Sequence, residues 1–187
     1  MNATVNEEIT LFPESVVDAD TIASPLIKRY SLIAAGVGLI PLPLVDAVLV
    51  GGVQVKMVYD LAKAFDIPFE ESRVKALVGS LVGGIAPTGI AGGVATLARA
   101  IPVVGVAAWY FVGPALAFAS TYAVGKVFSE HFQTGGTLLT FDADKIRVHY
   151  KREFEAALKS KKSDNAQAEV DKAAPTDATN ISGNAKK

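Results

Sequence analysis

The sequence of 187 residues contains no cysteine. Without a thiol, the chain can have no disulfide, no thiolate metal site and no cysteine nucleophile. Histidine is scarce too, because His131 and His149 are the only imidazoles and neither belongs to a paired carboxylate-and-histidine pattern. Isolated histidines of this kind are most simply interpreted as surface side chains. We therefore expect no catalytic residue, no metal site and no cofactor.

The chain also lacks a nucleotide-binding loop. A P-loop reads glycine, four residues, and then Gly-Lys-Ser/Thr. The only Gly-Lys pair is Gly125-Lys126, which is followed by Val127 and has Ser120 where the first glycine should stand. The net charge of −1 indicates no basic surface for nucleic acid. We therefore expect no enzymatic activity, no GTP binding by this chain itself and no nucleic-acid partner.

Charge is nearly absent from residues 76–125, where Arg99 is the only charged side chain. A surface helix of a soluble domain needs a polar face, whereas a membrane-spanning helix needs about 20 apolar residues. The segments 76–98 and 100–125 both reach that length. We expect a glycine-rich, hydrophobic, membrane-associated helical hairpin that turns near Arg99. Because Pro87 interrupts the first arm, the hairpin either spans the bilayer or dips in from one face.

Two glycine pairs in this run have the G-x-x-x-G spacing that lets helices approach closely in lipid. The pairs are Gly79 with Gly83 and Gly89 with Gly93. The same spacing also arises by chance in a stretch so rich in glycine and alanine. We take these four glycines as candidate helix-contact positions.

Prolines, glycines and helix-capping residues divide the chain into helices. Ser24-Pro25 has the composition of a helix start, since serine caps and proline suits the first turn. Asp66-Ile67-Pro68 and Gly135-Gly136 have the composition of helix ends. The expected helices cover about residues 25–39, 44–65, 70–85, a short segment ending near 100, 106–132 and 142–161. The sequence therefore predicts an all-α fold of five or six helices.

The expected organisation has four parts. They are an acidic, flexible N-terminus (1–22), a hydrophobic helical domain (23–141), a basic polar helix (142–162) and a disordered tail (163–187). Asp46, in an apolar context, is either a helix N-cap or a buried functional carboxylate.

Basic side chains at two places are candidates for contact with a partner or with lipid phosphates. Arg99 is one, although it equally fits a hydrated turn of the hairpin. The others lie in the helix expected at 142–162 and are Lys145, Arg147, Lys151 and Arg152. Anionic headgroups attract such clusters. Acidic residues are interspersed among them, so a solvated helix face is the alternative.

The positions of the basic residues also predict an orientation. Basic residues precede and follow residues 76–125, whereas Arg99 is the only basic residue inside this segment. Because Lys and Arg in short flanking segments stay on the cytoplasmic side, both termini are expected there. The N-terminus also lacks the basic start and apolar core of a Sec-type signal.

Several short segments resemble those of a bacterial domain of unknown function. They are Ile40-Pro41-Leu42-Pro43-Leu44-Val45-Asp46, Gln54-Val55-Lys56-Met57, Leu61-Ala62-Lys63, Arg73-Val74-Lys75-Ala76-Leu77, Ile101-Pro102-Val103-Val104-Gly105 and Thr121-Tyr122-Ala123-Val124-Gly125-Lys126. That family is found at the C-terminus of Era-like GTPases and in inner-membrane proteins of the YcjF type. The resemblance covers about residues 25–140 and implies an all-helical module of the bacterial inner membrane that works with a GTPase. This chain lacks a GTPase domain, so the GTPase would be a separate protein.

These observations leave three hypotheses. The leading one is a non-enzymatic membrane module that anchors, recruits or senses together with a separate GTPase. The first alternative is an oligomerising membrane-perturbing or channel-like protein, in which the glycine-rich hairpin inserts. The second is a soluble helical scaffold that buries the uncharged run internally.

Overall fold

The computed structural model describes residues 19–40, 45–84 and 102–173. These residues form helices joined by turns and contain no strand, so the predicted all-α fold is confirmed for this part of the chain. The helices are α1 (Ala19–Val37), α2 (Val45–Ala64), α3 (Glu71–Gly83), α5 (Pro102–Gln133) and α6 (Ala143–Ala173). The predicted turn at Arg99 and the predicted contacts at Gly89 and Gly93 lie outside the described residues.

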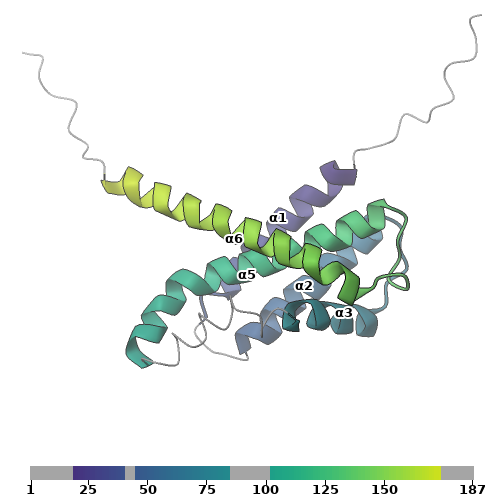
Figure 1. The fold of residues 1–187 in the computed structure, drawn as a ribbon, viewed down its shortest axis with the longest axis horizontal. Coiled ribbons are helices and arrows are strands. Elements are labelled where there is room, and N and C mark those ends of the chain that lie inside the picture. The colour runs from purple at the N-terminus through teal and green to yellow at the C-terminus, as the bar shows by residue number, and fades with distance from the viewer. Residues whose placement is uncertain (1–18, 41–44, 85–101, 174–187) are drawn as a thin grey trace, which may run out of the picture.

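Helix α5 is the centre of the arrangement, because it contacts each of the other four helices. Helix α1 packs along α5 and α2, and α3 packs on α2 and α6. Figure 1 shows α6 crossing over α5 on one face of the molecule. The core therefore lies between α5 and the helices around it.

Helix α1 begins before the Ser24-Pro25 start that its composition predicts. Its buried residues Ala23, Ile27, Tyr30 and Ala34 recur at the helical spacing and face the core. Ala23 lies ahead of Ser24 and is only 1% exposed. Packing against the core therefore extends the helix beyond its local capping signal.

Two of the predicted helix ends are confirmed, and both use the same backbone motif. At the end of α2, Asp66 adopts a positive φ of 56° and the Ile67 N–H donates to the Ala62 carbonyl at 2.7 Å. At the end of α5, Gly135 has φ 79° and the Gly136 N–H donates to the His131 carbonyl at 2.9 Å. These bonds are those of a Schellman motif, which satisfies the last carbonyls of a helix.

The two longest helices extend beyond the expected bounds. Helix α5 begins at Pro102 instead of near 106, because proline at the first helical position costs no hydrogen bond. Helix α6 continues to Ala173, past the expected end at 161. Ala and Lys, which favour helix, recur in the added segment.

None of the helices in the described ranges is both long enough and apolar enough to cross a bilayer.

Candidate functional site

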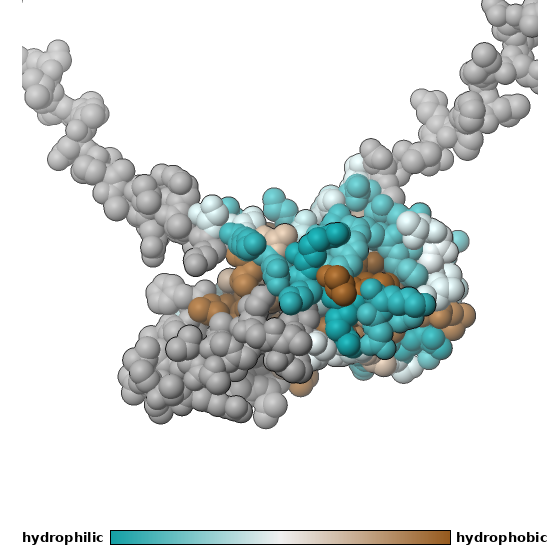
Figure 2. Space-filling model, viewed as in Figure 1, coloured by the Kyte–Doolittle hydropathy of each residue, from teal (hydrophilic) through white to brown (hydrophobic). Residues whose placement is uncertain are grey.

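The uncharged parts of four helices meet at one end of the molecule. Helices α1 and α3 end there, whereas α2 and α5 begin there (Figure 1). We call this region the apolar end and define it by residues 30–40, 47–55, 76–84 and 102–117, which contain no Asp, Glu, Lys or Arg. On the face seen in Figure 2, hydrophilic side chains dominate the opposite half of the molecule, at the right of the view.

Large apolar side chains are exposed at the apolar end. Val48 is 74% exposed, Leu32 52% and Tyr110 49%. Seven of the eleven large hydrophobic residues that are exposed in the described part of the chain belong to this end. Besides the three just named, the seven are Ile33, Leu39, Leu49 and Val82. Single exposed apolar residues are common on soluble proteins, but a concentration of them marks an interaction surface.

An apolar groove of about 640 Å³ lies between α2, α3 and α5. Its described lining, apart from Lys75 and Ser120, belongs to the apolar end, and Val48 and Val82 are also among the exposed apolar side chains. Glycines from all three helices line it, among them Gly52, Gly79 and Gly83. A Cβ atom at any of these three would meet no described atom within 4 Å. The predicted helix contact at Gly79 and Gly83 is thus made by no described helix and stays a prediction.

A second, more open basin of about 510 Å³ adjoins the groove, and its lining contains charged side chains. Its lining includes Lys56, Tyr59, Phe69, Glu71 and Lys75. The Lys56 Nζ atom lies 4.5 Å from the centre of the Tyr59 ring, and the Tyr59 and Phe69 rings meet edge to face at 5.0 Å. The Lys75 Nζ atom pairs with Glu71 Oε1 at 2.6 Å.

Behind the basin, Asp60 joins α1 to α2. The Tyr30 hydroxyl donates to one carboxylate oxygen of Asp60, and Lys56 Nζ lies 2.5 Å from the other. Partial burial raises the pKa of Asp60, but the hydrogen bonds from Lys56 and Tyr30 outweigh it and hold this pKa below its usual value. The same bond to Asp60 is the main cause of a raised pKa at Lys56.

A polar cluster closes the inner side of the groove. The Gln54 side-chain amide donates to the Ser120 hydroxyl at 3.0 Å and to the Thr121 hydroxyl at 3.3 Å. The Ser120 hydroxyl in turn lies 3.1 Å from the Tyr150 hydroxyl. Burial raises the pKa of Tyr150 to about 12. The cluster therefore links α2, α5 and α6 through neutral hydrogen bonds.

The predicted basic contacts on α6 are divided among local partners. Lys145 pairs with the carboxylate of Asp142 at 3.1 Å, and Lys151 reaches that of Glu155 at 4.0 Å. Arg147 packs against the end of α3, because a Cβ at Gly84 would lie 2.3 Å from its Nε. These side chains form a mixed face in the described part of α6, and their contact with lipid or a partner stays a prediction.

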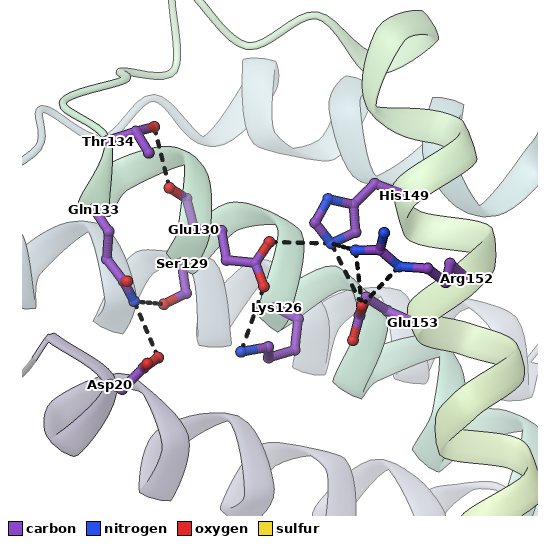
Figure 3. A network of polar contacts seen from close by, with 9 residues as sticks. All are labelled: Asp20, Lys126, Ser129, Glu130, Gln133, Thr134, His149, Arg152 and Glu153. Atoms are coloured by element: carbon purple, nitrogen blue, oxygen red, sulfur yellow. Dashed lines mark hydrogen bonds and ion pairs between the residues drawn. The ribbon is translucent and has the colours of Figure 1, made fainter.

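His149 stands in a charged network that joins α5 to α6 (Figure 3). Its Nε2 atom lies 3.0 Å from Glu130 Oε2, 3.4 Å from Glu153 Oε1 and 3.0 Å from a guanidinium nitrogen of Arg152. His131, by contrast, hydrogen-bonds the Thr137 carbonyl at 3.0 Å within one turn. Each histidine thus contacts groups of the protein itself. The described residues contain no group of three His, Asp or Glu side chains placed to bind a metal.

Comparison with known proteins gives two matches. A family model described as a domain of unknown function (DUF697) matches residues 14–152, which include α1, α2, α3 and α5. One similar curated protein is named magnetosome membrane protein 22, from Magnetospirillum gryphiswaldense. It is 36% identical over 144 residues, which cover 76% of this chain and 73% of that protein. No solved structure matches the chain.

Proposed function

The chain belongs to the DUF697 family of domains of unknown function, and on this premise we propose that it is a non-enzymatic helical module that associates with a membrane through its apolar end. The predicted resemblance to a domain of unknown function is thereby confirmed. The observation that carries the proposal is the concentration of exposed apolar side chains where four uncharged helix segments meet.

The energetics favour an apolar phase for this end. Moving one large apolar side chain fully out of water contributes roughly 1.5–3 kcal/mol. The seven partly exposed side chains therefore supply several kcal/mol toward binding an apolar phase. The relative from Magnetospirillum is named a membrane protein, which supports the same direction.

In this proposal the apolar end enters the hydrocarbon layer while the charged helix ends stay in water. Arg29, Lys63 and Arg73 lie on described helices beyond the apolar end. The rule that basic flanks stay on the cytoplasmic side then places the termini in the cytoplasm and the chain at the bacterial inner membrane. The proposal keeps both forms of the predicted hairpin, in which residues 76–125 either span the bilayer or enter one leaflet.

Two further features of the proposal concern partners. A separate Era-like GTPase, implied by the resemblance, is the proposed partner that the module would anchor, recruit or sense. The open Gly79 and Gly83 positions favour the alternative of an oligomer that perturbs the membrane, since exposed small residues let a second helix approach closely. The exposed apolar side chains argue against the soluble scaffold.

Flotation with phospholipid vesicles tests the proposal. Val48 on α2 and Val148 on α6 are 74% and 79% exposed, so Val48→Glu and Val148→Glu form a matched pair. We expect Val48→Glu to lower the vesicle-bound fraction of the full chain and Val148→Glu to leave it unchanged. Equal binding of the two variants, with helical content retained in both, would refute membrane association through the apolar end.

Release of a trapped dye from the same vesicles separates the proposal from its alternative. The module should bind without leakage. Leakage that rises steeply with protein concentration would instead support the oligomerising, membrane-perturbing protein.

A further inference from the structure

We propose that the groove and the adjoining basin together bind one phospholipid molecule, with an acyl chain in the groove and the phosphate between Lys56 and Lys75. This inference rests on the proposed membrane association and names the ligand of that same surface. It is carried by the junction of an apolar cavity with one whose lining includes two lysines.

The groove has the size and lining that an acyl chain requires. Its volume of about 640 Å³ falls within the roughly 300–1,000 Å³ typical of small-molecule sites. Valines and glycines dominate the lining, and among the residues that the structure describes Lys75 is its one charged member. No described atom lies within 4 Å of a Cβ built at Gly52 or Gly79, so a large side chain at either position would project into the groove.

The basin supplies the cations that a phosphate needs. Lys56 and Lys75 both line it, and their side chains are 56% and 62% exposed. Each ammonium group has three donors, of which a carboxylate one helical turn away takes one. The pair of Lys75 with Glu71 is exposed on both sides and so contributes little to stability, which lets a phosphate replace Glu71 there. At Lys56 the phosphate shares the ammonium group with the partly buried Asp60.

The two cavities form one continuous site, because Gly52, Val55 and Lys75 line both of them. An amphiphile with an apolar chain and a phosphate can therefore occupy groove and basin at once. Val48 and Val82 line the groove and are also exposed, so an acyl chain can enter it from the surface of the apolar end. An apolar peptide would fill the groove but would offer no acceptor to the ammonium donors that Asp60 and Glu71 leave free.

Native mass spectrometry of the full chain, purified in detergent, provides the direct test. The probe is lysophosphatidylglycerol, which carries one acyl chain and one phosphate. We expect one lysolipid molecule bound per chain and no displacement by inorganic phosphate. An alkyl maltoside should bind about tenfold more weakly than the lysolipid, or more weakly still, because it lacks the charge-assisted hydrogen bonds of the phosphate. Binding of the maltoside as tight as that of the lysolipid, or binding without saturation, would overturn the inference.

Two matched pairs of variants locate the site. Gly79→Leu should abolish the one-to-one complex by filling the groove, whereas Gly36→Leu, at an open helical position outside it, should not. Lys75→Gln should weaken binding by about tenfold, whereas Lys63→Gln, outside both cavities, should have no effect. Circular dichroism checks that each variant folds. If Gly79→Leu does not fold, the pair of lysine variants still tests the site.

Vesicle flotation of the same proteins separates failure of this inference from failure of the proposed function. A wild-type chain that floats but binds no lysolipid contradicts the phospholipid site and leaves the membrane module intact. A chain that binds one lysolipid but does not float contradicts the membrane module and supports the site. Unchanged lysolipid binding in both Gly79→Leu and Lys75→Gln rejects the assigned cavities.

Discussion

Replacing Gly125 by alanine is expected to destabilise the protein, whereas the same substitution at Gly79 is expected to stabilise it. Both glycines lie inside helices, α5 and α3 respectively. At Gly125 an added Cβ would lie 2.8 Å from Ile27 Cγ1 and 3.1 Å from Met57 Sδ. At Gly79 it would meet no described atom within 4 Å. The two sites therefore differ in packing and share the same gain in helix propensity.

The expected size follows from two opposing terms. Alanine in place of a helical glycine contributes roughly 0.5–1 kcal/mol of stability, and this is the whole effect at Gly79. Overpacking a core costs about 1–3 kcal/mol, so Gly125→Ala should lose about 1 kcal/mol on balance. Because Ile27 and Met57 are 1% and 0% exposed, neither can move into solvent to relieve the contact.

Thermal unfolding in one buffer measures both variants. For a chain of this length, 1 kcal/mol corresponds to a Tm shift of about 2–4 °C, so the expected order is Gly79→Ala, wild type, Gly125→Ala. In a double-mutant cycle, Ile27→Ala makes room for the new methyl group. Gly125→Ala should therefore cost about 1 kcal/mol less in that background. A Gly125→Ala protein at least as stable as Gly79→Ala would refute the close packing of α1 on α5.

Two further predictions concern pH. Burial raises the pKa of Tyr150 to about 12, so the unfolded chain releases this proton near pH 10 while the folded chain keeps it. Between pH 9 and pH 11 the wild type should therefore lose roughly 1 kcal/mol of unfolding free energy that Tyr150→Phe retains. Urea unfolding at the two pH values measures this difference, and equal losses in both proteins would contradict the buried hydroxyl. Partial burial raises the pKa of Asp60, but hydrogen bonds from Lys56 and Tyr30 lower it on balance. The ionised carboxylate therefore stabilises the folded state above about pH 4, and this stabilisation disappears as the pH falls through the folded-state pKa. Asp60→Asn should therefore cost about 1–3 kcal/mol at pH 7 and progressively less in acid, and a cost that does not change with pH would exclude the ionised carboxylate as its cause.

Local signals in the sequence predicted the ends of α2 and α5 well. The end of α2 at Asp66 and the end of α5 at Gly135 both depend on residues that tolerate a positive φ, and such residues are visible one at a time. The start of α1 was missed because Ala23 packs into a core that the capping signal at Ser24 does not report. Tertiary packing overrode local preference there.

The glycines show why contact sites are harder to predict than helices. A G-x-x-x-G spacing shows that two glycines share a helix face, but it does not show whether another helix covers that face. Gly79 and Gly83 have this spacing, but no described atom would lie within 4 Å of a Cβ at either position. The close approaches instead occur at Gly38, against the Gly113 carbonyl, and at Gly125. Their partners lie far away in sequence.

The candidate site was only partly visible for the same reason. The sequence predicted the apolar character of residues 76–125, and the structure adds the ends of α1 and α2 to that surface. The pairing of Tyr30 with Asp60 and of Gln54 with Ser120 joins residues 30 and 66 positions apart. No periodicity within one helix reports such pairs, and the groove exists only once three helices are assembled.

Quenching of a single tryptophan by lipids brominated in their acyl chains tests membrane association through the apolar end most directly. The chain has one tryptophan, Trp109, so Trp109→Phe combined with Tyr110→Trp moves the probe to a position that is 49% exposed at the apolar end. Trp109→Phe combined with Leu139→Trp places the control at a 74% exposed position outside it. On vesicles, the account predicts strong quenching for the Tyr110→Trp protein and little for the Leu139→Trp protein. Equal quenching of the two vesicle-bound proteins, or none for the Tyr110→Trp protein, would contradict it.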